Sequence, residues 1–272
     1  MRTQIEEALA LKFPPLAIFF SPALPEGVRL SSPLCSMLLL AQAAKGETVA
    51  LTRDSCRCHG AANGFGLENM NPDAFPGGRE CFLRFLSSGN QDWEQGRAVL
   101  EQLKEGGAPK ILLEEFAEGE GFLKNPEMVE DWLAGLPEAK PSGPYVIIKP
   151  LGDIKPGETP KVIVFLVNPD QLSALTVLAN FARKGLDAVR IPFGAGCACL
   201  GLLPFAEAEK ENPRAIMGLT DISARFYLRK PLGSDILSFT VPLGMFEEME
   251  SNVPKSFLTR FAWKTIMREN AT

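Results

Sequence analysis

The sequence predicts an α/β protein with a mixed sheet and flanking helices. Two short apolar segments with strand composition, residues 16–20 (LAIFF) and 161–167 (KVIVFLV), are each followed by a helical segment and then by another strand-like segment. Helices that alternate with short apolar strands are typical of βαβ-like units with partly parallel pairing. Hydrophobic residues make up 46% of the 272 residues, which is enough to bury a core without disulfide bonds.

The first strand–helix–strand series lies near the N-terminus. After the LAIFF strand, residues 35–46 (CSMLLLAQAAKG) are predicted to form a helix, and residues 48–53 (TVALTR) a strand. Gly46 is a typical helix end, because glycine adopts the left-handed conformation that closes many helices. The pair Cys56 and Cys58 follows this strand in a C-x-C-x-G pattern.

A similar series occurs in the second half. After the KVIVFLV strand, residues 171–185 (QLSALTVLANFARKG) are predicted to form a helix that also ends in glycine, and residues 187–193 (DAVRIPF) a strand. A second C-x-C-x-G pattern, with Cys197 and Cys199, follows. We therefore interpret the two series as copies of one duplicated unit.

The domain organisation follows from this interpretation. We predict a single domain over residues 1–272 that contains an internal repeat, with pseudo-repeats at residues 10–70 and 145–205. Residue identity between the two halves is low. Residues 137–144 (PEAKPSGP) have the composition of a linker and mark a soft boundary.

Other elements complete the predicted scaffold. Helices are predicted at residues 91–107, 125–136 and 255–270, and a strand is predicted at residues 235–243. Residues 220–230 (TDISARFYLRK) are interpreted as a strand with a solvated basic face. An anion-binding patch formed by Arg225, Arg229 and Lys230 is the alternative for that segment.

Composition and charge exclude several classes of protein. The formal net charge of −5 argues against a general affinity for nucleic acid or anionic membranes. No apolar run reaches the length of about 18 residues that a membrane span needs. The N-terminal segment carries Glu6 and Glu7 and is interrupted by prolines, which is atypical of a signal peptide. We expect a cytoplasmic protein without a nucleic-acid or membrane partner.

The six cysteines are the main functional signal. Disulfides are not expected in a reducing compartment, so each cysteine is interpreted as a ligand or as a small buried apolar residue. Ligands gather at the carboxyl ends of strands in open α/β sheets, and two C-x-C turns at equivalent strand ends would bring four thiols together. We predict that one inorganic centre is bound by Cys56, Cys58, Cys197 and Cys199. Reserve ligands are Cys35, Cys81 and the only histidine, His59.

The expected centre is an iron–sulfur cluster, with [4Fe–4S] favoured over [2Fe–2S]. Thiols separated by one residue are close for two ligands of one small ion, whereas a cluster presents separate iron atoms. Glycines around both pairs would let backbone N–H groups approach the sulfurs. The alternatives are a non-enzymatic module that binds or senses zinc or a heavy metal, redox-active or purely structural thiols, and a small-molecule-binding protein with incidental cysteines.

No catalytic residue is assigned, and whether the protein is an enzyme stays open. A single histidine excludes a His-rich metal site, and the sequence lacks a nucleophile elbow, a Walker phosphate loop and a dinucleotide fingerprint. A cluster with four cysteine ligands would transfer electrons to a redox partner protein, whereas an open iron would activate a substrate as a Lewis acid. A homodimer is a further open possibility.

Several motifs also carry a family resemblance over most of the chain. They are PPLAIFF near the start, Cys35, Cys58 with HGAANGFGL, KPL, KVIVFLVNPDQLSAL and the late ISAR and SFTVP segments, of which the NPDQ block is the most specific. On these motifs the chain resembles the uncharacterised family known as domain of unknown function 169. The resemblance implies a prokaryotic protein, common in anaerobes, in which an oxygen-sensitive cofactor is permitted. It supplies no reaction and no catalytic residue, and it associates a cysteine with the position of Asp221.

Overall fold

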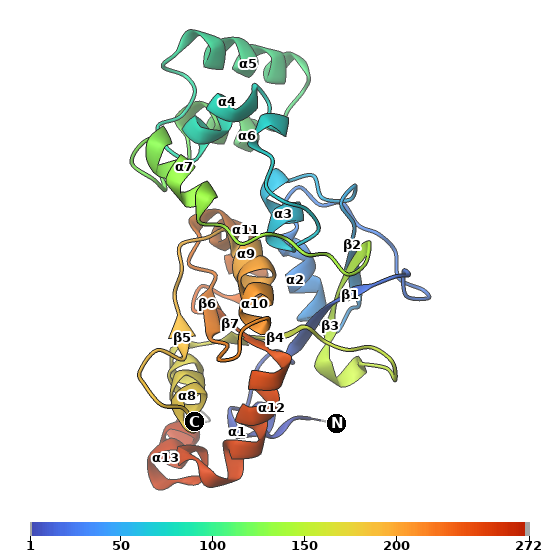
Figure 1. Cartoon of the computed structure of the whole chain (residues 1–272), viewed down its shortest axis with the longest axis vertical. Helices are drawn as coiled ribbons and strands as arrows, with labels where there is room; N and C mark the ends of the chain where they lie inside the picture. The colour runs from blue at the N-terminus through green and yellow to red at the C-terminus, as the bar shows by residue number, and fades with distance from the viewer. Residues whose placement is uncertain (1, 270–272) are drawn as a thin grey trace. The chain divides into compact units, whose positions relative to one another are not determined.

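The computed structural model describes residues 2–269 (Figure 1). The chain divides into two compact units. The first unit comprises the described residues up to Asn69 and from Glu138 onward, and the second comprises Met70–Pro137. The return to the first unit falls at the start of the linker-like segment 137–144.

The first unit is built on a seven-stranded sheet with the order β2-β3-β1-β4-β7-β6-β5. The strands are β1 (Leu16–Ser21), β2 (Val49–Leu51), β3 (Tyr145–Pro150), β4 (Val162–Val167), β5 (Val189–Arg190), β6 (Ala215–Gly218) and β7 (Leu237–Pro242). Between described strands, β5 and β6 form the one parallel pair and the other neighbours are antiparallel. The predicted α/β class with a mixed sheet is confirmed, although parallel pairing is confined to one edge.

Helices cover both faces of this sheet (Figure 1). One face carries α2 (Met37–Ala43), α3 (His59–Gly64), α9 (Gly196–Leu200), α10 (Leu202–Ala208) and α11 (Ile222–Leu232). The opposite face carries α1 (Gln4–Ala8), α8 (Pro169–Asn180), α12 (Leu243–Asn252) and α13 (Phe261–Glu269). Within the described residues, no helix is both long enough and apolar enough to cross a membrane.

The strands alternate between these two faces with a period of two residues. In β4, Val162 and Val164 belong to the apolar cluster beneath α2 and α11, whereas Ile163 and Phe165 belong to the cluster beneath α8 and α12. All four side chains are fully buried. Burial on both faces explains why the central strands read as continuous apolar runs in the sequence.

The internal repeat is not confirmed. The central strands β1 and β4 are antiparallel neighbours, with β3 beside β1 and β7 beside β4. If the two halves were copies, a twofold rotation about an axis perpendicular to the sheet would relate β1 and β3 to β4 and β7. Such a rotation would keep equivalent helices on the same face of the sheet. Helices α2 and α8 instead lie on opposite faces. Gly46, just after α2, and Gly185 have positive φ values of +100° and +97°, but α8 ends at Asn180, so the predicted helix end at Gly185 is wrong.

The prediction of a strand at residues 220–230 is wrong, because this segment forms α11. The side-chain carboxylate of Asp221 accepts hydrogen bonds from the backbone N–H groups of Ser223 and Ala224, which caps the helix N-terminus. Arg229 and Lys230 lie in the last turn, where positive charge is favourable to the helix dipole. The preceding strand, β6, ends at Gly218.

The second unit is helical. It contains α4 (Gly78–Phe85), α5 (Glu94–Glu105), α6 (Lys110–Glu118) and α7 (Pro126–Ala134). Fully buried Asn90 donates its side-chain amide to the carbonyls of Cys81 and Phe116 and accepts a hydrogen bond from Trp93 Nε1. Cys81 is a buried free thiol of this unit and packs with Leu100 and Phe116.

Candidate thiol site

The contact between α3 and α9 brings the two cysteine pairs into one region. Cys58 is the residue before α3, and Cys197 lies in the first turn of α9. The Cys197 thiol donates a hydrogen bond to the Gly60 carbonyl at 3.3 Å. A Cβ atom on Gly60 would be 3.7 Å from the Cys58 sulfur, so the thiols of Cys58 and Cys197 lie against the same residue of α3.

Glycine at position 64 permits this close approach. A Cβ atom at Gly64 would collide with the Cys197 sulfur and would lie 2.8 Å from the backbone nitrogen of Ala198. Gly201, at the end of α9, also lies against Gly64, because a Cβ atom added to Gly201 would collide with the Gly64 carbonyl oxygen. Two small residues therefore set the distance between the helices.

Cys35 also lies in this region, just before α2. Met37 lies two residues after Cys35, and its methyl group is 3.4 Å from the position that a Cβ atom on Gly196 would occupy. Gly196 directly precedes Cys197 in the chain. Cys35 itself packs against the same apolar cluster as Cys197. We refer to Cys35, Cys58 and Cys197 as the thiol site.

Electrostatics reflect this proximity. Burial is the main reason that the pKa of the Cys197 thiol is raised well above its usual value. Negative charge on Cys58, Asp221 and Cys35 would raise this pKa further, in that order. Cys58 is exposed, Cys35 is half-buried and Cys197 is buried, so the thiol site runs from the surface into the core.

Cys56 is a buried member of the apolar core next to the thiol site. Burial is the main cause that raises the pKa of its thiol to about 11, and the Ser36 hydroxyl beside it acts in the opposite direction. Cys58 and Arg53 exert weaker and opposing effects. The first C-x-C pair thus has one exposed and one buried member.

Cys199 is turned away from Cys197. The second C-x-C pair lies inside a helix instead of a turn, and residues two positions apart do not share a helix face. The Cys199 sulfur is 3.9 Å from the Gly194 carbonyl, and its Cβ approaches Gly218 in β6. The side chain has no exposed surface, and burial followed by the Asp221 charge raises its pKa to about 12.

Asp221 connects the thiol site to α11. Besides capping that helix, its carboxylate accepts a hydrogen bond from the Gly196 N–H at 2.7 Å, which holds the start of α9. Burial raises the pKa of this carboxyl, although the three backbone N–H groups act in the opposite direction. In the sequence, Asp221 stands out only as the position where the family resemblance associates a cysteine. Its place before a helical ISARFYL segment is the typical N-cap signal that identifies it.

The proposed four-thiol ligand set spans more than one local environment. Within the part of the chain that the structure describes, no three His, Cys, Asp or Glu side chains lie close enough to hold one metal ion. Of the reserve ligands, Cys35 lies in the thiol site and Cys81 in the second unit. The His59 side chain lies outside the described residues.

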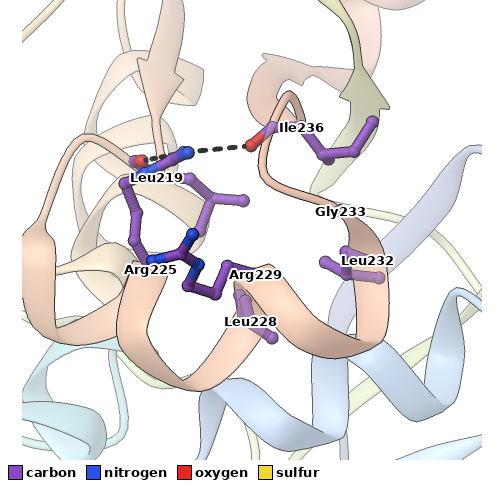
Figure 2. Close-up of a pocket in the computed structure, with 7 residues that line it drawn as sticks. All are labelled: Leu219, Arg225, Leu228, Arg229, Leu232, Gly233 and Ile236. Carbon is purple, nitrogen blue, oxygen red and sulfur yellow. Dashed lines mark hydrogen bonds between the residues drawn. The ribbon is translucent and has the colours of Figure 1, made fainter.

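The basic segment of α11 forms a separate feature. Figure 2 shows a pocket whose lining includes Leu219, Arg225 and Ile236. The Arg225 guanidinium donates hydrogen bonds to the carbonyls of Leu219, Ile236 and Ser234, so it fixes α11 to the segment before β7. These bonds give Arg225 a structural role, and the anion-binding alternative for Arg225, Arg229 and Lys230 stays a prediction.

Comparison with known proteins settles the family. Residues 4–252 match the sequence model of DUF169, described as "Uncharacterised ArCR". The chain belongs to this family. The match confirms the resemblance seen in the DUF169 motifs and covers both cysteine pairs and Asp221. No curated protein and no solved structure matches the chain.

Proposed function

We propose that this DUF169 protein binds an iron–sulfur cluster at the thiol site and uses it in electron transfer or a redox step. The observation that carries the proposal is the meeting of Cys58 and Cys197, one from each C-x-C pair, at Gly60 of α3. These residues are far apart in the sequence, and Cys35, from a third segment, packs against the apolar cluster that contains Cys197. Thiolates are typical donors for a thiophilic metal centre.

The charge balance of the thiol site supports a cationic guest. Three thiolates and the Asp221 carboxylate would repel one another in a partly buried site, and this repulsion adds to burial, the main cause, in raising the pKa of the Cys197 thiol. Iron ions would offset this repulsion, and binding would release the thiol protons. A bound centre therefore stabilises an arrangement that thiolates alone would disfavour.

A cluster accepts thiols that lie farther apart than the ligands of one ion. Tetrahedral zinc, with Zn–S bonds of about 2.3 Å, holds its sulfurs only about 3.8 Å apart. In a cluster each thiolate binds a different iron, so the sulfurs lie farther apart. Within the described residues no three His, Cys, Asp or Glu side chains could hold one metal ion, so the support for a centre is the placement of Cys58 and Cys197 against Gly60.

The exposure of Cys58 is consistent with exchange at the surface. A cluster beside an exposed ligand lies within a short distance of a docked protein, so we propose a redox partner protein as the electron donor or acceptor. A reducing cytoplasm would keep the thiols and the cluster intact. Electron transfer and Lewis-acid activation both remain within the proposed function, because both use the same centre.

Anaerobic purification tests the proposal. Wild-type protein should be brown and should contain iron and acid-labile sulfide in comparable amounts. Cys197→Ser should lose both, whereas Cys81→Ser, in the second unit, should retain them. Colourless protein that holds zinc, or iron that is unchanged in Cys197→Ser, would contradict the proposal.

A further inference from the structure

We infer that the chain forms a twofold-symmetric homodimer through the edge of its sheet at β5, with a second copy of itself as the partner. The inference goes beyond the proposed function and does not depend on a bound metal. It concerns an exposed apolar surface beside β5, which we call the β5-edge surface. Its members are Val177, Phe181, Leu186, Ile191 and Phe193.

Strand β5 is the last strand on its side of the sheet (Figure 1). Among the described strands it pairs with β6 alone, so the other side of β5 is an open edge. At the opposite end of the sheet, Leu30 forms a bridge with Ala50 of β2. An open strand edge offers backbone N–H and C=O groups to another chain, which makes it a common place of association.

The members of the β5-edge surface lie close to one another around this edge. Val177 and Phe181, four residues apart at the end of α8, share one helix face. The Asn180 side-chain oxygen accepts a hydrogen bond from the Ala188 N–H, which holds the end of α8 against the residue before β5. Leu186 lies in the intervening turn and is 98% exposed. The other two members follow β5 directly in the chain.

The size of the β5-edge surface suits a protein partner. Its residues expose on the order of 500 Å² of mostly apolar surface. A standard stable interface buries about 800 Å² per partner, so these residues would supply more than half of it and a polar rim the rest. Exposed apolar patches of this size typically mark interaction sites.

The charges beside Leu186 favour a second copy as that partner. Arg183 and Arg190 are held in ion pairs with glutamates of the same chain. Lys184 and Asp187 are exposed and flank Leu186 with opposite charges. A uniformly acidic or basic partner would meet only one of these two charges favourably, whereas a second copy offers both.

A twofold axis near Leu186 makes the β5-edge surface complementary to itself. In a twofold interface, residue i of one copy contacts residue j of the other, and residue j contacts residue i. Lys184 of each copy would therefore face Asp187 of the other, with the two Leu186 side chains packed between these ion pairs. The open edges of the two β5 strands would run antiparallel beside this contact.

Matched leucine variants test the surface by analytical ultracentrifugation in reducing buffer. Wild-type protein should sediment as a dimer of two 29.6 kDa chains. Leu186→Asp should weaken the dimer about a hundredfold, because two carboxylates would be buried in an apolar contact. Leu30→Asp, also at an exposed leucine but at the opposite end of the sheet, should keep the wild-type dimer. Circular dichroism shows whether each variant is folded.

A charge exchange tests the identity of the partner. Lys184→Asp and Asp187→Lys should each weaken the dimer about tenfold at low salt, because each places like charges together at two symmetric positions. The double variant, with both substitutions in one chain, should restore the wild-type affinity. This recovery is specific to a contact in which the two positions face each other across a twofold axis.

Three results would overturn the inference. The first is wild-type protein that stays monomeric at every concentration measured, which would leave the β5-edge surface to a different partner. The second is a dimer equally stable in folded Leu186→Asp and Leu30→Asp, which would place the interface elsewhere. The third is a double variant no tighter than the single charge variants. None of these results bears on iron content, so the proposed function is tested separately.

Discussion

Replacing Gly64 with alanine should disturb the thiol site without removing a sulfur. The new methyl group would collide with the Cys197 sulfur and stand 2.8 Å from the Ala198 nitrogen and 2.9 Å from the Cys197 Cβ. The Ala198 nitrogen belongs to the backbone of α9, so the strain cannot be relieved by a side-chain rotation. Helix α3 must move away from α9, and overpacking of this kind costs about 1–3 kcal/mol.

Gly60→Ala in the same helix is the matched control. Its methyl group would be 3.7 Å from the Cys58 sulfur, which is an ordinary contact. Both substitutions gain helix propensity of up to about 1 kcal/mol, so this contribution cancels when the two variants are compared. The free energy of unfolding of Gly64→Ala should therefore be about 1–3 kcal/mol below that of Gly60→Ala.

Urea unfolding followed by circular dichroism, in anaerobic reducing buffer, measures this difference. Iron content per chain should fall in Gly64→Ala and stay at the wild-type value in Gly60→Ala, because only the first moves Cys197 relative to α3. Equal stability and equal iron content in the two variants would refute the role of the α3–α9 contact.

Substitutions at three further residues test other parts of the structure. Glu207 is buried, and although burial raises its pKa, hydrogen bonds from Lys210, the Arg214 N–H and Arg190 hold it at about 2, compared with 4.5. A shift of this size corresponds to about 3 kcal/mol, which we reduce to about 2 kcal/mol because its partners are partly exposed. Glu207→Gln should lose this stability at pH 7 in urea unfolding. The difference from wild type should shrink as pH falls from 4.5 through about 2, and a constant difference would be contrary evidence. Asn90→Ala should lower the free energy of unfolding by about 1–3 kcal/mol, since the carbonyls of Cys81 and Phe116 lose the side-chain amide and Trp93 Nε1 loses its acceptor, and an unchanged midpoint would exclude that role. Asp221→Ala should cost about 1 kcal/mol as a lost helix cap and should lower iron content, whereas Asp221→Asn should retain most of the cap; identical behaviour of the two variants would argue against it.

The parts of the fold that sequence predicts are those encoded by local patterns. The apolar segments at residues 16–20 and 161–167 become β1 and β4, and Gly46 follows the end of α2 with positive φ. The prediction of a strand at residues 220–230 was wrong, because it gave more weight to the strand-like composition than to Asp221, which is the N-cap of α11. The helical unit at Met70–Pro137 was not anticipated either, since a compact unit depends on contacts between distant segments.

The candidate site shows the same division. Sequence spacing identified Cys58 and Cys197, and the structure brings both against Gly60. The spacing does not indicate which cysteine of each pair faces the other pair, because that depends on whether a C-x-C segment lies in a loop or in a helix. The proximity of Cys35 depends on the packing of α2 and α9, which no local pattern encodes.

Iron and acid-labile sulfide per chain, measured on wild-type protein purified and assayed without oxygen, test the central claim most directly. The account predicts both elements in near-equal amounts, with the iron lost when Cys58 and Cys197 are replaced together by serine. Wild-type protein that contains neither element, even after incubation with ferrous iron and sulfide under reducing conditions, would contradict it.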